Sequence, residues 1–167
     1  FRKLVALHPI VRRTLLALTL ARGALAYAQE QFRCDRDAPA ADGEGGSGHR
    51  VMLVAGIDSK LTEPGGSSFD LEPERLGYAS EEATYFSYSG AATYRADDTL
   101  TDIETSAREL GEQLKAMQIA DPGREVDLVA HSQGGVVVIA FLELVYDPGD
   151  PDYPPLGTVI TFASPLD

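Results

Sequence analysis

The amino-acid sequence predicts an α/β fold, with helices on both faces of a mostly parallel sheet in a three-layer α/β/α arrangement. Three observations lead to this prediction. From residue 50 onward, short apolar runs typical of buried strands alternate with longer segments of helical periodicity. Clusters of Pro, Gly and Asp separate the segments. Strands and helices that alternate in this way form right-handed βαβ units, which build a parallel sheet.

The first half of this region predicts two strands separated by a long polar connection. Residues 51–55 form a continuous apolar run that ends at Gly56, which is typical of a parallel strand buried on both faces. Residues 58–83 are polar and contain turn signals, with a short helix expected near 73–80. Residues 84–88 are rich in β-forming types and stop at a Ser-Gly pair, which predicts the second strand.

A helix is predicted next, because apolar residues recur at spacings of three and four. The residues on this face are Leu100, Ile103, Ala107, Leu110, Leu114 and Met117. Thr101, followed three residues later by Glu104, fits a capping box at the start of the helix. An Asp-Pro-Gly sequence at 121–123 ends it.

The last part of the sequence predicts strand, helix and strand again. Residues 126–130 form the third strand, and residues 133–146 form an apolar helix that a second Asp-Pro-Gly sequence stops at 147–149. Residues 156–163 form the fourth strand. The predicted α/β domain therefore covers residues 50–167.

The first 33 residues differ from the rest in charge, since they sum to +5 while the whole chain carries −12. Arg12 and Arg13 precede a short apolar core at 14–21, and small residues then suit cleavage before Gln29. Residues 1–33 are therefore expected to be a signal peptide, and the protein to be secreted. The core is short for a bilayer span and Arg22 interrupts it. A membrane anchor and an amphipathic helix of the folded domain remain the alternatives.

Residues 34–49 are rich in Gly, Asp and Ala and are expected to be a flexible linker.

Composition limits the kinds of partner and ligand that the protein is expected to bind. The strongly acidic body repels phosphate backbones, which argues against nucleic-acid binding. Cys34 is the single cysteine and cannot form a disulfide within this sequence. One Cys and three scattered His predict no metal-ligand cluster, and no cofactor is expected.

The most informative stretch is the junction between the third strand and the following helix. A turn this sharp leaves no room for side chains two residues before and after its apex, which explains Ala130 and Gly134. The hydroxyl of Ser132 would then project above the carboxyl edge of the sheet, where open α/β sheets bind ligands. The helix directs its positive end toward the same space, and the N–H of Gln133 would stabilise an oxyanion there. The alternative is a Gly-rich turn in which Ser132 only caps the helix.

The sequence Ala-His-Ser-Gln-Gly at 130–134 resembles the nucleophile elbow of α/β-hydrolases, in the variant where Ala replaces the first Gly. Bacillus-type lipases and esterases similar to the GPI inositol-deacylase group carry such elbows. In those enzymes the first buried strand ends in His-Gly-x, and residue x lends its N–H to the oxyanion hole. The resemblance assigns this role to Ile57, with Gly56 allowing close approach, although Ala55 stands in place of the His. The turn at 161–166 resembles the Gly-Thr-Pro-type turn of the same enzymes.

A serine nucleophile needs a histidine base and an orienting carboxylate, which follow it in the order Ser, acid, His in α/β-hydrolases. No histidine follows Ser132. His8 lies in the expected leader, and His49 precedes its strand, roughly 20 Å from the catalytic edge at about 3.3 Å per residue. His131 adjoins the serine and is expected to pack or to form hydrogen bonds beneath the elbow. Asp167 is a candidate acid. The chain is therefore expected to be the N-terminal part of a hydrolase, inactive by itself.

The expected function is that of a serine carboxylic-ester hydrolase, a lipase or esterase, which acts through an acyl-enzyme on a small-molecule or lipid ester. Contact with a membrane surface is left open. Other acyl-transfer enzymes share the same elbow, so a thioesterase, an amidase and an acyltransferase remain alternatives. A non-catalytic relative that only binds a ligand is the alternative from another class.

Overall fold

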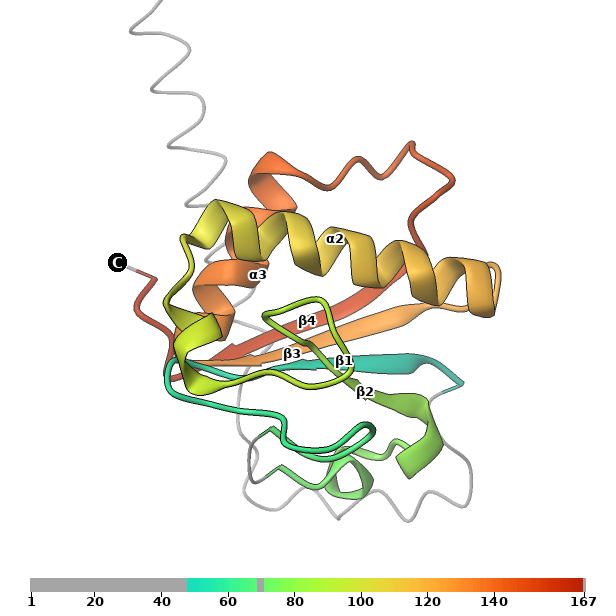
Figure 1. Ribbon diagram of the computed structural model, residues 1–167. Helices are drawn as coiled ribbons and strands as arrows, with labels where there is room; N and C mark the ends of the chain where they lie inside the picture. Colours follow the sequence, from blue (N-terminus) through green and yellow to red (C-terminus); the bar gives the residue numbers. More distant parts are fainter. Residues whose placement is uncertain (1–47, 69–70, 167) are drawn as a thin grey trace, which may run out of the picture. The chain divides into compact units, whose positions relative to one another are not determined.

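The computed structural model describes residues 48–68 and 71–166, and Figure 1 shows their arrangement. Four strands form one parallel sheet in the order β2-β1-β3-β4. The strands are β1 (Arg50–Val54), β2 (Ala83–Tyr85), β3 (Val126–His131) and β4 (Leu156–Phe162). Helix α2 (Ile103–Ala120) follows β2, and helix α3 (Gln133–Leu144) follows β3. The predicted α/β fold with a parallel sheet is confirmed.

Several predictions fall on residues outside the described ranges. The expected leader at 1–33 lies there, as do Cys34, the candidate acid Asp167 and all but the last two residues of the expected linker at 34–49. Among the described residues, no helix combines the length and the apolar character that crossing a bilayer requires.

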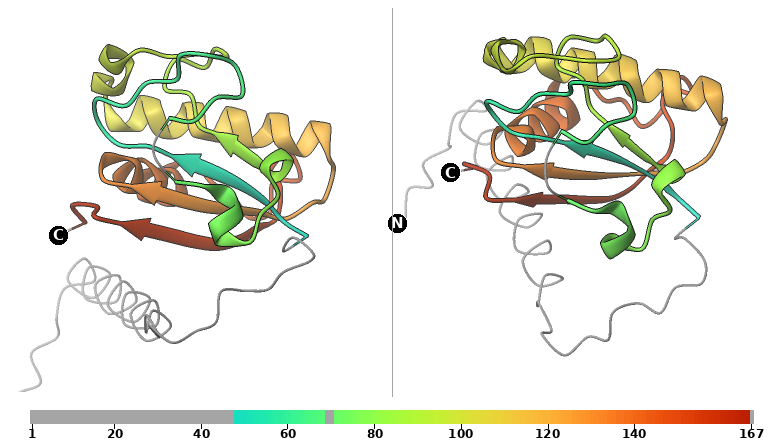
Figure 2. Two further views of the ribbon diagram at one scale, coloured as in Figure 1. Left: turned by 90° about the horizontal axis from the view of Figure 1, so that it is seen from below. Right: turned by 60° about the horizontal axis from the view of Figure 1, so that its bottom comes forward.

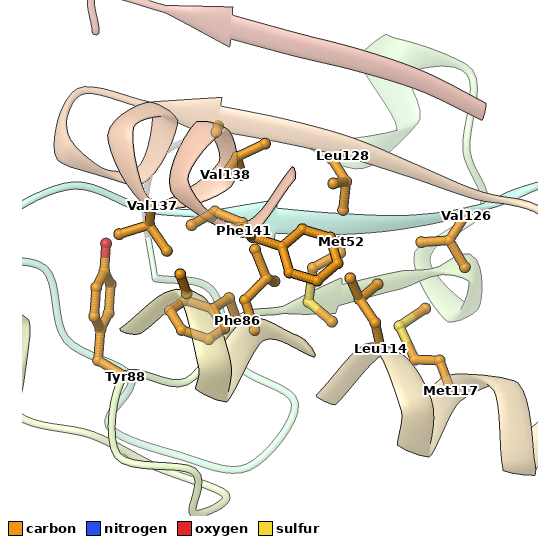
Figure 3. Close-up of a cluster of buried hydrophobic side chains, with 14 of the residues drawn as sticks. Met52, Phe86, Tyr88, Leu114, Met117, Val126, Leu128, Val137, Val138 and Phe141 are labelled. Carbon is orange, nitrogen blue, oxygen red and sulfur yellow. The ribbon is translucent and has the colours of Figure 1, made fainter. Parts of the chain in front are cut away.

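Both α-helices cover the same face of the sheet, and the main apolar core lies between them and the strands (Figures 1 and 3). The spacing of apolar residues along helix α2 and along strands β1 and β3 explains which side chains form this core. The buried face of α2 contains the predicted residues Ala107, Leu110, Leu114 and Met117. Alternate residues of β1 and β3 point to the same side, so Met52 and Leu128 meet the helices. Phe86 and Phe141 fill the space between them.

The opposite face of the sheet has a different cover. Val51, Leu53 and Val129 point to this side and pack against Tyr78. That tyrosine belongs to the connection from β1 to β2, which contains the short 3₁₀ helices η1 (Pro73–Leu76) and η2 (Ser80–Glu82) and no α-helix within the described residues (Figure 2). The expectation of helices on both faces is therefore corrected. The connection is polar and rich in Gly and Pro, so it lacks the apolar stripe that an α-helix needs to pack.

The start of α2 also differs from the prediction. Asp102 is the N-cap, and its carboxylate accepts a hydrogen bond from the N–H of Thr105 at 2.9 Å. The capping box predicted at Thr101 is therefore wrong, because Asp is the stronger N-cap of the two neighbours. Leu100 does not belong to the buried face of the helix. It ends the 3₁₀ helix η3 (Ala96–Leu100), and its side chain is 64% exposed.

The second strand is shorter than predicted. β2 ends at Tyr85, although the N–H of Phe86 still donates to the carbonyl of Leu53 at 2.9 Å. The chain then leaves the sheet, and Tyr88 enters the main core with its hydroxyl 2.6 Å from the carbonyl oxygen of Ala55. The aromatic residues that indicated a longer strand are thus core residues that follow it. The other strands and α3 agree with the prediction to within two residues.

Candidate active site

The order of the strands creates a topological switch point between β1 and β3, at the carboxyl edge of the sheet. From β1 the chain moves to β2 on one side, whereas from β3 it moves to β4 on the other side. The connections that leave β1 and β3 therefore diverge at the carboxyl edge. Open α/β sheets bind their ligands at such a switch point. Gly56 follows β1 and Ser132 follows β3, so both lie at this point.

Ser132 occupies a strained turn between β3 and α3. Its backbone has φ 55° and ψ −127°, a conformation that residues other than glycine rarely adopt. The fold holds it there because its N–H donates to the carbonyl of Phe162 at 3.1 Å, while its own carbonyl accepts from Gly135 at 3.0 Å. Its side chain makes no capping hydrogen bond to α3. The Ser132 hydroxyl therefore does not serve as a side-chain cap of this helix.

Small residues around the turn are required by the close approach of β1. A Cβ atom on Gly134 would lie 2.6 Å from the carbonyl oxygen of Ala55 and would also clash with that of Val54. A Cβ atom on Gly56 would lie 2.7 Å from the Cβ of Ser132. Gly134 thus shows the steric limit expected two residues after the serine, and Gly56 allows the close approach expected of it. The first small residue, Ala130, is completely buried in the core that α3 covers.

Strain is concentrated at the same edge of the sheet. Among the described residues, three that are not glycine have a positive φ, at 61° for Asp58, 55° for Ser132 and 51° for Ala163. Each lies just beyond the carboxyl end of a strand, after β1, β3 and β4 respectively. Such conformations are maintained at functional sites, where the surrounding structure enforces them. The edge that contains Ser132 is thus the strained edge of this sheet.

Two amide donors lie beside the serine. Ile57 and Gln133 directly follow Gly56 and Ser132, which approach each other so closely that a Cβ atom on Gly56 would lie 2.7 Å from the Cβ of Ser132. Within the described part of the chain, neither of their N–H groups donates a hydrogen bond. Gln133 is the first residue of α3, where the helix dipole adds a partial positive charge. Both N–H groups predicted to be donors thus have no acceptor among the described residues.

The two described histidines make contacts with a ring on β4 and with a carboxylate on β3. The ring of His131 packs against the ring of Phe162 on β4, with 5.1 Å between their centroids. This matches its expected packing role beneath the elbow. His49 lies at the amino edge of the sheet, where its Nδ1 is 3.1 Å from Oδ2 of Asp127.

The amino edge of the sheet holds a polar cluster that the sequence analysis missed. Asp127 is 97% buried, and its carboxylate accepts hydrogen bonds from the Tyr78 hydroxyl at 2.6 Å and the Thr158 N–H at 2.5 Å. His49 lies between this carboxylate and Glu125, whose Oε2 is 3.4 Å from Nε2 of the imidazole. Burial, followed by the hydrogen bond to Asp127, raises the pKa of Tyr78 well above its usual value. The signal for this cluster was a charged residue inside an apolar strand.

The same cluster corrects the expectation that no group of metal-ligating side chains exists. Ligand atoms of His49, Glu125 and Asp127 all lie within 4.8 Å of one another. The sequence argument counted cysteines and histidines and overlooked a histidine combined with carboxylates. In this structure the two imidazole nitrogens face different carboxylates, and the oxygens of Asp127 already accept other donors. The arrangement is that of a hydrogen-bonded network.

No protein-family model matches this sequence, and neither does any curated protein.

Proposed function

We propose that this protein is a serine carboxylic-ester hydrolase of the α/β-hydrolase type, with Ser132 as its nucleophile. The conformation of Ser132 carries the proposal. A strained turn with φ 55° and ψ −127° puts a side chain that makes no capping hydrogen bond at the switch point between β1 and β3. Gly56 and Gly134 are the residues that allow this turn to pack against the end of β1.

The proposed reaction passes through an acyl-enzyme. The Ser132 oxygen attacks the ester carbonyl carbon as its proton moves to a base, and the carbonyl oxygen becomes an oxyanion. The N–H groups of Ile57 and Gln133 stabilise that oxyanion. Collapse of the intermediate releases the alcohol, and water then hydrolyses the acyl-serine. The base is proposed to be a histidine outside the described residues, because His49 and His131 face other groups.

The surface near the serine supports an apolar acyl group. Ile57 beside the elbow is 52% exposed and Leu100 is 64% exposed. Leu100 is close to the elbow because the carbonyl of the preceding residue accepts a hydrogen bond from Nε2 of Gln133 at 3.0 Å. Phe162, at the end of β4, is 39% exposed. The net charge of −12 disfavours anionic substrates. The substrate class proposed is therefore an uncharged small-molecule or lipid ester.

A fluorophosphonate tests this proposal in the full gene product that contains the chain. One phosphonyl group should attach to Ser132, detected by intact mass and peptide mapping, and short p-nitrophenyl esters should be hydrolysed. The variant S132A should lose both. The matched control is S164A, because Ser164 follows β4 at the same edge and should leave both unchanged. Absence of labelling and of hydrolysis in the full gene product would contradict the proposal. Acyl transfer to an added amine or alcohol instead of water would favour an acyltransferase.

Export is proposed from the residues at 1–33 alone. The basic start, short apolar core and small residues predict removal of the leader before Gln29. N-terminal sequencing of the mature protein tests this cleavage, and a retained leader would favour a membrane anchor.

A further inference from the structure

We propose that Thr99 is a positioning residue that fixes the two proposed oxyanion donors relative to each other. This inference rests on the proposed function, since it concerns the same two N–H groups, those of Ile57 and Gln133. Thr99 lies in η3, in the connection between β2 and α2, and is far from the elbow in the sequence. Its side chain is completely buried.

Thr99 is hydrogen-bonded to the segments that follow β1 and β3. Its Oγ1 accepts a hydrogen bond from the N–H of Asp58 at 3.1 Å, on the connection that leaves β1. Its carbonyl oxygen accepts a hydrogen bond from Nε2 of Gln133 at 3.0 Å, on the elbow that follows β3. The hydroxyl donates in turn to the carbonyl of Ala96 at 2.6 Å, which fixes the rotamer. One buried residue therefore links two segments that no strand pairing connects beyond the end of the sheet.

The Asp58 contact controls the backbone beside one donor. Asp58 has φ 61°, so its backbone is strained and needs an external partner to stay in place. The side chain of the preceding Ile57 is 52% exposed, and packing alone does not fix it. A local turn, in which the Ser59 N–H donates to the Gly56 carbonyl at 3.3 Å, also holds the backbone of Ile57 and Asp58. Loss of the hydroxyl at position 99 would remove the hydrogen bond of the Ile57–Asp58 peptide, while the turn at Gly56 and the Ser59–Tyr94 contact at 2.7 Å would remain.

The Gln133 contact controls the residue that carries the other donor. The side-chain Oε1 of Gln133 is buried and has no hydrogen-bond partner within the described residues. The contact of Nε2 with the Thr99 carbonyl therefore defines how this amide is oriented. A buried polar atom without a partner is costly, and the fold retains this glutamine in spite of that. The observation supports a role for its side chain in anchoring the elbow.

The chemistry of the hydroxyl decides which replacements should work. Thr99 Oγ1 both accepts from a backbone N–H and donates to a backbone carbonyl. Serine can do both, whereas valine has the shape of threonine and can do neither. A comparison of T99V with T99S therefore separates the hydroxyl from the shape of the side chain. Ser106→Ala is the matched control, because Ser106 is a buried hydroxyl on α2 without a hydrogen-bond partner in the described chain.

The first readout is amide hydrogen exchange of the Asp58 N–H in the full gene product, which does not require a reactive serine. T99V should remove the protection of this amide, while T99S and S106A should retain it. The second readout is the rate of fluorophosphonate labelling. T99V should lower it on the order of 10- to 100-fold, less than the 10²- to 10³-fold expected for complete loss of a donor. In ester hydrolysis the loss should appear in kcat with KM unchanged, because the donors contact the oxyanion.

Three results separate this inference from the proposed function. Unchanged exchange and labelling in T99V would overturn the inference while leaving Ser132 as the nucleophile. Equal damage in T99S and T99V would also overturn it, because shape rather than the hydroxyl would then matter. Lost protection in T99V combined with an unreactive wild-type serine would contradict the proposed function, and the link from Thr99 to Asp58 would stand as a structural contact.

Discussion

Strand β3 runs from the amino edge of the sheet to its carboxyl edge, and the polar residues at these two edges have opposite environments. Asp127 near the start of β3 is buried and accepts hydrogen bonds from Tyr78 and Thr158 while facing His49. Ser132, just past the end of the same strand, has a strained backbone and lies beside donors without partners in the described residues. The amino edge thus shows how a fold satisfies a buried carboxyl group, and the carboxyl edge shows how it maintains a strained turn.

The comparison predicts that substitutions at the two edges separate stability from reactivity. The largest effect on stability is expected for D127A, which leaves the Tyr78 hydroxyl, the Thr158 N–H and His49 without their common acceptor. The free energy of unfolding should fall by about 3 kcal/mol, the magnitude for breaking a buried charged network. Urea denaturation measures this change, and the rate of labelling at Ser132 in the folded protein should stay the same.

The control for this variant is D97A. Asp97 is exposed, and its ion pair with Arg95 lies on the surface. The free energy of unfolding should therefore change by about 0.5 kcal/mol or less. A D127A variant as stable as the wild type would contradict the structural role of the amino edge. Slower labelling in D127A than in D97A would show that the two edges are coupled.

The second prediction concerns the contact between β1 and the elbow. In G56A the new Cβ would lie 2.7 Å from the Cβ and 3.1 Å from the Oγ of Ser132, so the serine must shift. Overpacking of this kind destabilises a protein by about 1–3 kcal/mol. Labelling should be largely lost in protein that is still folded, as judged by circular dichroism. Gly149→Ala, in the loop after α3, is the control and should preserve labelling. Full reactivity of G56A would contradict the close approach.

The third prediction measures the strain itself. Glycine accepts a positive φ, so S132G should relieve strain of about 1–3 kcal/mol at this position, offset by about 0.5–1 kcal/mol of backbone entropy. The variant should therefore be more stable than the wild type by about 1 kcal/mol while losing all labelling. Urea denaturation checks this gain. Ser164→Gly is the control, because Ser164 has no positive φ and should only be destabilised. A loss of stability in S132G would show that no strain is stored there.

The carboxyl edge could be predicted from the sequence because its signals are local. Ser132, Gly134 and the strand before them occupy adjacent positions, and steric limits at a sharp turn dictate their types. Gly56 is distant in the sequence, but it ends an apolar run that is itself a local signal. The parallel sheet follows from the alternation of strands and helices, which is a property of the whole chain.

The amino edge could not be predicted, because its partners are separated by long stretches of chain. His49 and Asp127 are 78 residues apart, and Tyr78 and Asp127 are 49 apart, so no local pattern connects them. A similar limit applies to Thr99, whose partners Asp58 and Gln133 come from two other connections. Hydrogen bonds of this kind depend on the tertiary fold, and side-chain types alone do not specify their pairing.

The smallest effect is expected in the pH dependence of stability. Each edge of the sheet has a tyrosine whose pKa is raised. Burial raises the pKa of Tyr78, which donates to Asp127, and of Tyr88, which donates to the carbonyl of Ala55. The folded state thus favours the neutral phenol. The stability it contributes is complete below the unfolded pKa of about 10 and declines as the pH rises toward the folded pKa.

Phe variants at the two positions should make this decline visible. The advantage of the wild type over Y78F and over Y88F in urea denaturation should be largest near pH 9 and should shrink by about pH 11, because the phenol ionises more readily in the unfolded chain. Only Y88F should also slow labelling, since it frees the carbonyl of Ala55 next to Gly56. Equal slowing in both variants would mean that the amino edge controls the serine, and the distinction between the edges would then be lost.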